Sequence, residues 1–220
     1  MEKTSYIIRK YNLKDKPAIR KICSDTGLLG NPINKIFSDR EIFADLITNY
    51  YLKKEPNNTF VIESNKEIIG YLTGSLNKFA RLGLILNGIK PITKAVYNQL
   101  TGKYNKHPQN KEFLKWILTK LIFCVPNHPK KAAHAHFNLK SGFRHKGIGT
   151  NLIETALKNF ASKLKQKNIK KIYGEVVSHS KKSEEYFKKA GFDIFDKRET
   201  TLFKDHIKEK VYLMCITKDI

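Results

Sequence analysis

Cysteine is scarce in this sequence. The chain of 220 residues has three cysteines, Cys23, Cys124 and Cys215, which lie far apart, each beside an apolar residue. Three thiols cannot all pair within one chain, and no two of them have the spacing of metal ligands. We therefore predict buried thiols in a reducing compartment, with neither a disulfide nor a metal site.

Long apolar runs are also missing. No stretch approaches the roughly 18 apolar residues that a membrane helix needs. The first residues, Met1 to Thr4, lack the apolar centre of a secretory signal. We expect no membrane span and a cytoplasmic protein. With 40% hydrophobic residues, the chain can bury one sizeable core, which predicts a single domain over residues 1–220.

Acidic residues and arginine are in short supply. There are 42 Lys and Arg against 20 Asp and Glu, which gives a formal net charge of +22, but six of the 42 are arginine. Specific phosphate and base recognition favours the fork of arginine, and the lysines are spread over the whole chain. A general compositional bias is the favoured interpretation, and an acidic partner such as RNA is the alternative. No helix-turn-helix or zinc pattern indicates specific nucleic-acid binding.

Hydrophobic periodicity indicates alternating strands and helices. A core of residues 4–75 and 132–217 is expected, with a helical insertion at 76–131. The expected strands are 5–11, the hairpin 59–75, 133–139, 171–177, 193–203 and 210–217. One helix is expected to end near Thr26, and a second is expected to begin after Asp39 as its N-cap. Further helices are expected over 91–100, 112–125 and 147–165, and in a short segment that ends in "KKAGF".

The expected helix at 112–125 has an unusually wide apolar stripe. Phe113, Trp116 and Ile117 share one face, while Ile122 and Phe123 extend the stripe beyond an ordinary amphipathic pattern. Packing onto the main domain is the favoured interpretation. A membrane-surface or partner-binding helix, or a substrate lid, is the alternative.

The stretch "FRHKGIGTNL", residues 143–152, joins an expected strand to the most regular expected helix. A helix N-terminus offers unpaired N–H groups and a positive dipole end to an anion. Gly147 and Gly149 allow close backbone approach, Arg144 and Lys146 add charge, and Thr150 adds a hydroxyl. Neither the Walker spacing nor the dinucleotide fingerprint occurs. The pattern suits a pyrophosphate, although turns of this kind without a ligand are common.

Two longer blocks resemble a known family. "HFNLKSGFRHKGIGTNLIETAL" (136–157) and "YGEVVSHSKKSEEYFKKAGF" (173–192) resemble the acetyl-CoA-binding core of the GNAT superfamily of N-acetyltransferases, the first through Arg/Gln-x-x-Gly-x-Gly/Ala. "FSDREIFADLITNYY" with "AHAHFNL" resembles a bacterial branch. The resemblance implies an α/β GNAT fold, with a mixed, mostly antiparallel sheet whose central strands splay. It also implies direct acetyl transfer from acetyl-CoA to a primary amine, without a metal.

The resemblance also assigns residues to acetyl-CoA. It implies that the main chain of Phe137, Asn138 and Leu139 pairs with the pantetheine arm. The pyrophosphate would lie against the turn and helix start formed by Arg144, His145, Lys146, Gly147, Ile148, Gly149 and Thr150. Ser180 stands at the usual asparagine position and either binds the pantetheine or caps its helix. Phe187 stands where the family usually has its tyrosine.

Catalytic residues are harder to assign. The resemblance makes Glu175, five residues before Ser180, the candidate general base. Tyr186 is one residue from the usual acid position, and a shift of one residue turns a helical side chain by about 100°, so we expect it to face elsewhere. His134 and His136 share a strand face with Asn138; His136 is either a second base candidate or part of a structural polar row.

The acceptor is not identified by the sequence. A small molecule or a peptide amine is possible, and Asp39, Glu41, Asp45 and Glu63 could form an acidic pocket for a basic amine. The alternative to an enzyme is a catalytically weak module that binds CoA or an acidic partner such as RNA. A homodimer is also left open.

Overall fold

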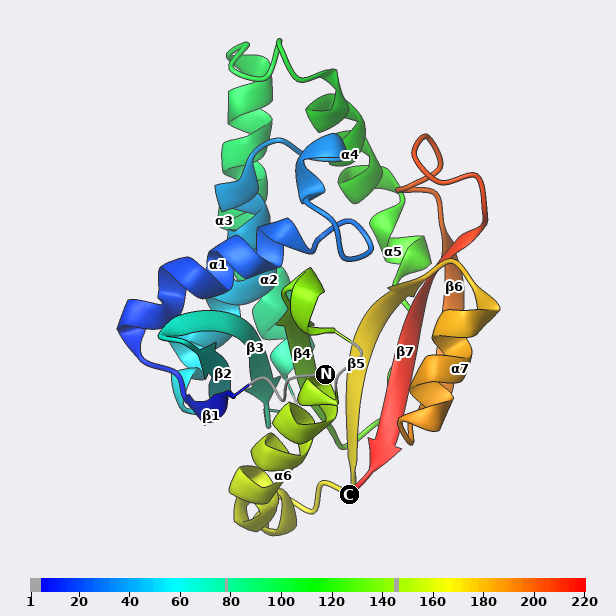
Figure 1. The fold of residues 1–220 in the computed structure, drawn as a ribbon. Helices are drawn as coiled ribbons and strands as arrows, with labels where there is room; N and C mark the ends of the chain where they lie inside the picture. Colours follow the sequence, from blue (N-terminus) through cyan, green and yellow to red (C-terminus); the bar gives the residue numbers. More distant parts are fainter. Residues whose placement is uncertain (1–4, 78, 145–146) are drawn as a thin grey trace.

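A seven-stranded sheet forms the centre of the molecule (Figure 1). The computed structural model describes residues 5–77, 79–144 and 147–220. Within them the strand order is β1-β2-β3-β4-β5-β7-β6, and every neighbouring pair is antiparallel except β4 and β5. The strands are β1 Ile7–Lys10, β2 Thr59–Ser64, β3 Glu67–Ser75, β4 Ala132–Leu139, β5 Lys171–Ser178, β6 Asp193–Thr200 and β7 Val211–Asp219.

Helices cover both faces of the sheet. They are α1 Lys16–Asp25, α2 Arg40–Lys54, α3 Ala80–Leu100, α4 Pro108–Thr119, α5 Leu121–Cys124, α6 Ile148–Gln166 and α7 Lys181–Lys189. On one face, the apolar stripe of α6 packs with side chains of β2, β3, β5 and β7, and Phe187 of α7 packs against the same cluster. On the other face, Ile19 and Ile22 of α1 pack with Val61 and Tyr71. The mixed, mostly antiparallel α/β fold that the resemblance implied is confirmed.

The region between β3 and β4 differs most from its prediction. α3 begins at Ala80 instead of near Pro91, and Pro91 lies inside it. The predicted helix over 112–125 is interrupted: α4 ends at Thr119 and α5 is a separate turn. Gly83, Gly88 and Pro91 have low helix propensity, but Gly83 packs so closely against Tyr50 that a Cβ there would lie 2.3 Å from its ring. Tertiary packing on α2 therefore overrides the local signal.

The two parallel strands in the middle of the sheet separate after a short paired stretch. Over the described residues, β4 and β5 pair from Ala132 to His134 and from Lys171 to Tyr173. Beyond that point β4 keeps its pairing with β3, and β5 keeps its pairing with β7. The sheet thus opens into a fork whose two arms are Ala135–Leu139 and Gly174–Ser178.

Candidate active site between the central strands

The base of the fork is held by a close backbone contact. A Cβ added to Gly174 would lie 2.7 Å from the carbonyl oxygen of Ala135, so only glycine fits there without moving a strand. Lys140 donates its N–H to the Ile69 carbonyl, and residues of an antiparallel strand alternate in direction. The N–H and C=O of Phe137 therefore point away from β3, into the fork.

Glu175 lies on the β5 arm, directly after this contact. Its Oε2 is 2.6 Å from Nε2 of His134 on β4, and about a third of its side chain is exposed. The other ring nitrogen of His134, Nδ1, is hydrogen-bonded to the hydroxyl of Tyr51 on α2. Three elements that are distant in sequence thus form one chain of hydrogen bonds at the base of the fork.

The protonation states along this chain follow from the surroundings. Burial, followed by the nearby charge of Glu175, raises the pKa of Tyr51 well above its usual value, so Tyr51 keeps its proton and donates it to Nδ1. His134 then carries its proton on Nε2 and donates it to Glu175. Burial alone would raise the pKa of Glu175, but its interaction with His134, which includes the hydrogen bond, outweighs burial and lowers the pKa. Glu175 is a carboxylate at neutral pH, with Oε1 left for a substrate.

Aromatic rings enclose the histidine. The ring centroid of Tyr173 lies 4.7 Å from that of His134, and His128 stacks on Tyr173 at 5.2 Å. Tyr51 itself is 1% exposed. These rings exclude water from the histidine and leave the carboxylate of Glu175 as its more accessible partner.

His136 lies one pleat further along β4, on the same face. Its Nε2 is 3.2 Å from the hydroxyl of Tyr71 and 3.1 Å from Nδ2 of Asn138, and that amide also donates to Tyr71 at 3.0 Å. Burial, and to a smaller extent the charge of His134, lowers the pKa of His136 to about 4. A neutral ring with occupied hydrogen bonds fits the structural polar row, while its role as a base stays a prediction.

The predicted anion turn leads directly into α6. Gly147 is the N-cap with φ of +76°, a left-handed conformation that favours glycine. The first N–H that bonds within the helix is that of Asn151, to Gly147. Since the first N–H groups of a helix lack intrahelical partners, we expect those of Ile148, Gly149 and Thr150 to be available to a ligand, while the Ile148 side chain is buried in the core. His145 and Lys146 lie outside the described residues.

Arg144 is used within the protein. Its Nε donates to the Leu139 carbonyl at 3.0 Å. Its guanidinium also lies against Gly30, where a Cβ would come within 2.0 Å of it. The side chain therefore braces the end of β4 against the loop that follows α1, and burial lowers its pKa.

A groove lies between α6 and α7, beside Phe137 of the β4 arm. Its lining includes five residues that the sequence analysis singled out, namely Phe137, Gly149, Thr150, Tyr186 and Phe187. Phe187 is packed against the core, whereas Tyr186 is 47% exposed at the rim. The two side chains thus differ in exposure as the one-residue shift predicts, although both line the groove, and the catalytic role of Tyr186 stays a prediction.

Ser180 has a helix-capping role. It is the N-cap of α7, and its hydroxyl oxygen accepts the N–H of Ser183 at 3.4 Å. Its contact with pantetheine stays a prediction.

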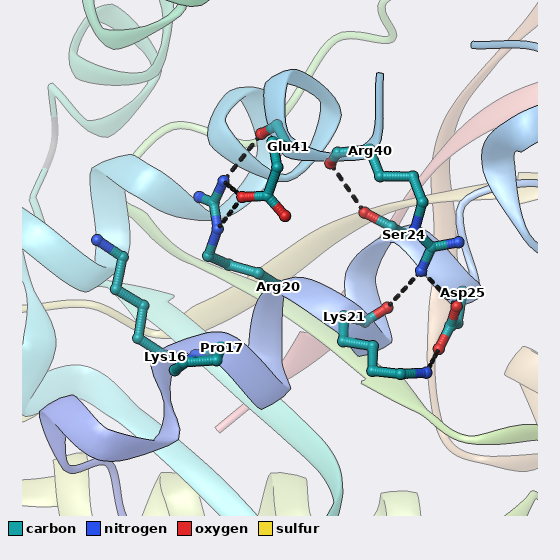
Figure 2. Close-up of a pocket in the computed structure, with 8 residues that line it drawn as sticks. All are labelled: Lys16, Pro17, Arg20, Lys21, Ser24, Asp25, Arg40 and Glu41. Atoms are coloured by element: carbon teal, nitrogen blue, oxygen red, sulfur yellow. Dashed lines mark hydrogen bonds and ion pairs between the residues drawn. The ribbon is translucent and has the colours of Figure 1, made fainter. Parts of the chain in front are cut away.

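A second, wider hollow lies between α1 and α2 (Figure 2). Figure 2 shows the guanidinium of Arg20 turned toward Glu41, while Arg40 and Lys21 meet at Asp25. Arg20 also binds Asp45 at 2.6 Å. The opposite charges neutralise one another, so this hollow is an ion-pair cluster that fastens α1 to α2.

The predicted acidic acceptor pocket is not formed. Glu41 and Asp45 are paired with Arg20, and Glu63 is paired with Arg9 at 2.8 Å. Asp39 caps α2 through the Ile42 N–H and accepts the Tyr104 hydroxyl. Each carboxylate already has a structural partner.

Sequence reasoning missed two members of the site. Neither Tyr51 nor Tyr173 was given a role by the sequence analysis. Tyr51 and His134 are separated by 83 positions, so no local pattern could join them. The signal that was present is the alternation of His134 and His136 on one strand face.

The main features of the site are a parallel strand pair that separates and a glycine-capped helix that follows one of its arms. Residues 107–192 match the model of the Acetyltransferase (GNAT) family. This segment, which includes β4, α6, β5 and α7, is similar to that family, in agreement with the resemblance seen in the sequence. No curated protein sequence matches it significantly.

Solved structures share the fold at low sequence identity. The structure described as SsHAT has 18% identity and a TM-score of 0.62, with 98% of each chain covered. The ribosomal-protein-alanine N-acetyltransferase from Brucella melitensis has 12% identity and a TM-score of 0.53, covering 97% of this chain and 99% of that one. The PaiA N-acetyltransferase from Thermoplasma acidophilum, in complex with coenzyme A, has 14% identity and a TM-score of 0.51, covering 98% and 99%.

Neither a metal-ligand cluster nor a membrane-spanning helix occurs among the described residues. Among the described residues, His, Cys, Asp and Glu form no group of three that could hold a metal ion. In the same part of the chain, each helix is too short or too polar to cross a membrane.

Proposed function

We propose that this protein transfers acetyl from acetyl-CoA to a primary amine of a small molecule or peptide, with Glu175 as the general base. The observation that carries the proposal is the position of Glu175. Its carboxylate stands at the base of the fork, fixed through one oxygen by His134 at 2.6 Å and open through the other. A positioned carboxylate of lowered pKa is ionised and ready to accept a proton.

Acetyl-CoA fits the β4 arm of the fork, opposite Glu175 on the β5 arm. The N–H groups at the start of α6 and the dipole of this 19-residue helix favour the negative charge of a pyrophosphate. The outward N–H and C=O of Phe137 can pair with the amides of a pantetheine arm as a neighbouring strand would. The groove lined by Phe137, Thr150 and Phe187 connects these two places.

The reaction needs the amine to lose a proton as it attacks the thioester carbon. Glu175 accepts that proton, directly or through one water, the new C–N bond forms, and the C–S bond breaks as the thiolate leaves. His134 and Tyr51 contact neither reactant in this scheme. They hold the carboxylate in one orientation, which makes them positioning residues.

Direct attack is favoured over a covalent acetyl-enzyme. Cys215 faces Glu175 across the β5–β7 register and is the thiol nearest in the ladder. Burial, and to a smaller extent the charge of Glu175, raises its pKa to about 12. A thiol that stays protonated is a poor nucleophile, so the amine itself attacks the thioester.

Protonation of the leaving thiolate is assigned less directly. Phe187 has no hydroxyl, and Tyr186 lies at the groove rim. Tyr186 or water is the proton source in this proposal. The missing tyrosine also supports the second candidate function, a CoA-binding module with weak turnover.

The test is release of CoA thiol from acetyl-CoA over a panel of amines, compared between wild type and Glu175→Gln. We expect kcat to fall by about 100-fold or more, with the dissociation constant of CoA unchanged within about twofold. Glu199→Gln is the matched control, because it removes a carboxylate of the edge strand β6 whose ion-pair partner is Lys210.

The two candidate functions give different results. If wild type binds CoA but both it and Glu175→Gln are inert with every amine, the weak-module function replaces the enzyme. If wild type turns over and Glu175→Gln is equally fast, another residue is the base.

A further inference from the structure

Helix α3 presents its large apolar side chains to solvent. Leu82, Ile85, Leu86 and Ile89 are between 54% and 60% exposed. At 100° per residue they fall within a stripe about 100° wide. On the opposite face, which packs on the molecule, Leu84 is a partly buried apolar residue, and the buried residues are small or polar, namely Ala80, Gly88, Pro91, Ala95 and Asn98. A helix of a water-facing surface normally shows the reverse pattern.

Further exposed apolar side chains lie in the same segment of the chain. In the described part of the chain, ten of the fifteen exposed large apolar side chains lie between residues 76 and 131. They include Leu118, Ile122 and Phe123 of α4 and α5, of which Ile122 is 78% exposed. Figure 1 shows α3 and α4 standing together beyond one end of the sheet. Exposed apolar surface concentrated in this way marks an interaction site.

The charge of the same segment is equally one-sided. Residues 76–131 contain eleven Lys and Arg and one carboxylate, Glu112, although the whole chain has 20 carboxylates. On the helical wheel, Arg81 flanks the apolar stripe on one side and Lys90 and Lys94 flank it on the other, and all three are exposed. General lysine bias does not account for the loss of carboxylates here.

We propose that the surface formed by α3, α4 and α5 docks on an anionic lipid bilayer, with the stripe Leu82, Ile85, Leu86 and Ile89 inserted at the headgroup level. A helix with an apolar face bordered by Lys and Arg lies in the bilayer interface, where both kinds of side chain are satisfied. An RNA would bind the cationic side chains but would leave the apolar stripe exposed to water. In a second copy of the chain, residues 76–131 have the same eleven positive charges and one negative charge, a net +10, so the two surfaces would repel each other.

The docking proposal is independent of acetyl transfer and concerns where the enzyme works. Arg81, at the start of α3, is close enough to the candidate site for its charge to lower the pKa of Tyr173, against the burial that raises that pKa overall. A protein docked through α3 would therefore hold the face that carries Glu175 near the lipid surface.

The test is flotation of the full chain with vesicles of phosphatidylcholine, with and without phosphatidylglycerol. We expect wild type to float with the anionic vesicles and to stay behind with the neutral ones. The variant Leu82→Gln/Ile85→Gln/Leu86→Gln/Ile89→Gln should lose at least about tenfold in partitioning, because it removes the inserted area. Its melting temperature should stay unchanged, because these side chains are exposed.

Two matched controls separate the apolar and ionic parts. Ile7→Gln/Phe195→Gln removes apolar side chains of similar exposure elsewhere and should float like wild type. Lys90→Glu/Lys94→Glu should weaken partitioning by about fivefold or more per lysine, whereas Lys158→Glu/Lys165→Glu on exposed positions of α6 should cost less.

Three results would overturn the docking proposal. Wild type may be left behind by anionic vesicles. The four-glutamine variant could float as well as wild type, which would indicate a purely ionic polyanion site. Sedimentation could instead show a wild-type dimer that the four-glutamine variant abolishes, without vesicle binding, which would assign the surface to self-association.

Discussion

Tyr51 connects helix α2 to the proposed reaction centre through a single hydroxyl. The hydroxyl donates to His134, which in turn fixes one oxygen of Glu175. Without this donor, nothing holds the ring proton of His134 on Nε2, so the Glu175 carboxylate can lose the hydrogen bond that lowers its pKa. The hydroxyl thus keeps the carboxylate ionised as well as oriented.

Tyr51→Phe should lower kcat by about tenfold, leave the KM for acetyl-CoA unchanged, and move the acid limb of the pH–rate profile to higher pH. The measurement is thiol release across pH. Tyr50→Phe is the control, because the neighbouring hydroxyl donates to Glu55 instead. Equal effects of the two substitutions, or an unmoved acid limb, would leave Tyr51 with a packing role alone.

His136 makes the stability of the protein depend on pH. Its pKa is lowered to about 4 by burial, whereas an unfolded histidine titrates near 6.5. The unfolded chain therefore binds a proton first, so stability is complete above about pH 6.5 and falls as the pH drops toward 4. His136 should contribute a loss of about 1 to 2 kcal/mol between pH 7 and pH 5.

Urea unfolding of wild type and His136→Gln at these two pH values measures this contribution. The variant should lose less stability on acidification than wild type does. His206→Gln, which changes an exposed loop histidine, should behave like wild type. Parallel losses in all three proteins would show that other groups cause the acid sensitivity.

At the scale of elements, the fork depends on the close approach of β4 and β5. The Gly174 backbone lies where a Cβ would press on the Ala135 carbonyl at 2.7 Å. Backbone cannot yield as a flexible side chain can, so Gly174→Ala should push the two strands apart. Because Glu175 is the next residue, the His134 hydrogen bond would lengthen with them.

We expect Gly174→Ala to lower the free energy of unfolding by about 1 to 3 kcal/mol and to reduce kcat more than it weakens CoA binding. Denaturant unfolding and thiol release measure the two effects. Gly142→Ala is the control, because its Cβ would meet nothing within 4 Å. A stable and fully active Gly174→Ala protein would mean that the fork tolerates a wider base.

Local patterns predicted the elements that local sequence determines. The strand before Gly147, the stripe of α6, the Asp39 cap and the left-handed Gly191 at φ of +78° after α7 all follow from spacing within a few residues. α3 was predicted too short because Gly83, Gly88 and Pro91 disfavour a helix on their own. The absence of side chains at Gly83 and Gly88 lets α3 approach Tyr50 and Leu46 of α2. This tertiary contact cannot be read from the sequence of α3 alone.

At the scale of the whole molecule, only the part of the site within residues 132–192 could be predicted. The family resemblance supplied Glu175 and the α6 turn, because both lie in one continuous stretch of residues 132–192. Tyr51 comes from a helix 83 positions away from His134, and its contact exists only after the sheet has assembled. The use of Asp39, Glu41, Asp45 and Glu63 as structural partners was hidden for the same reason.

The fork also places an unfinished sheet edge at the centre of the fold. Free strand edges are ordinarily found at the margins, where proteins protect them with charges or covering loops, because an open edge can recruit a strand from another chain. Here the outward main chain of Phe137 lies between two arms of the same sheet. A co-substrate bound in the fork would pair with these free main-chain groups, and it would therefore also prevent this edge from pairing with a strand of another chain.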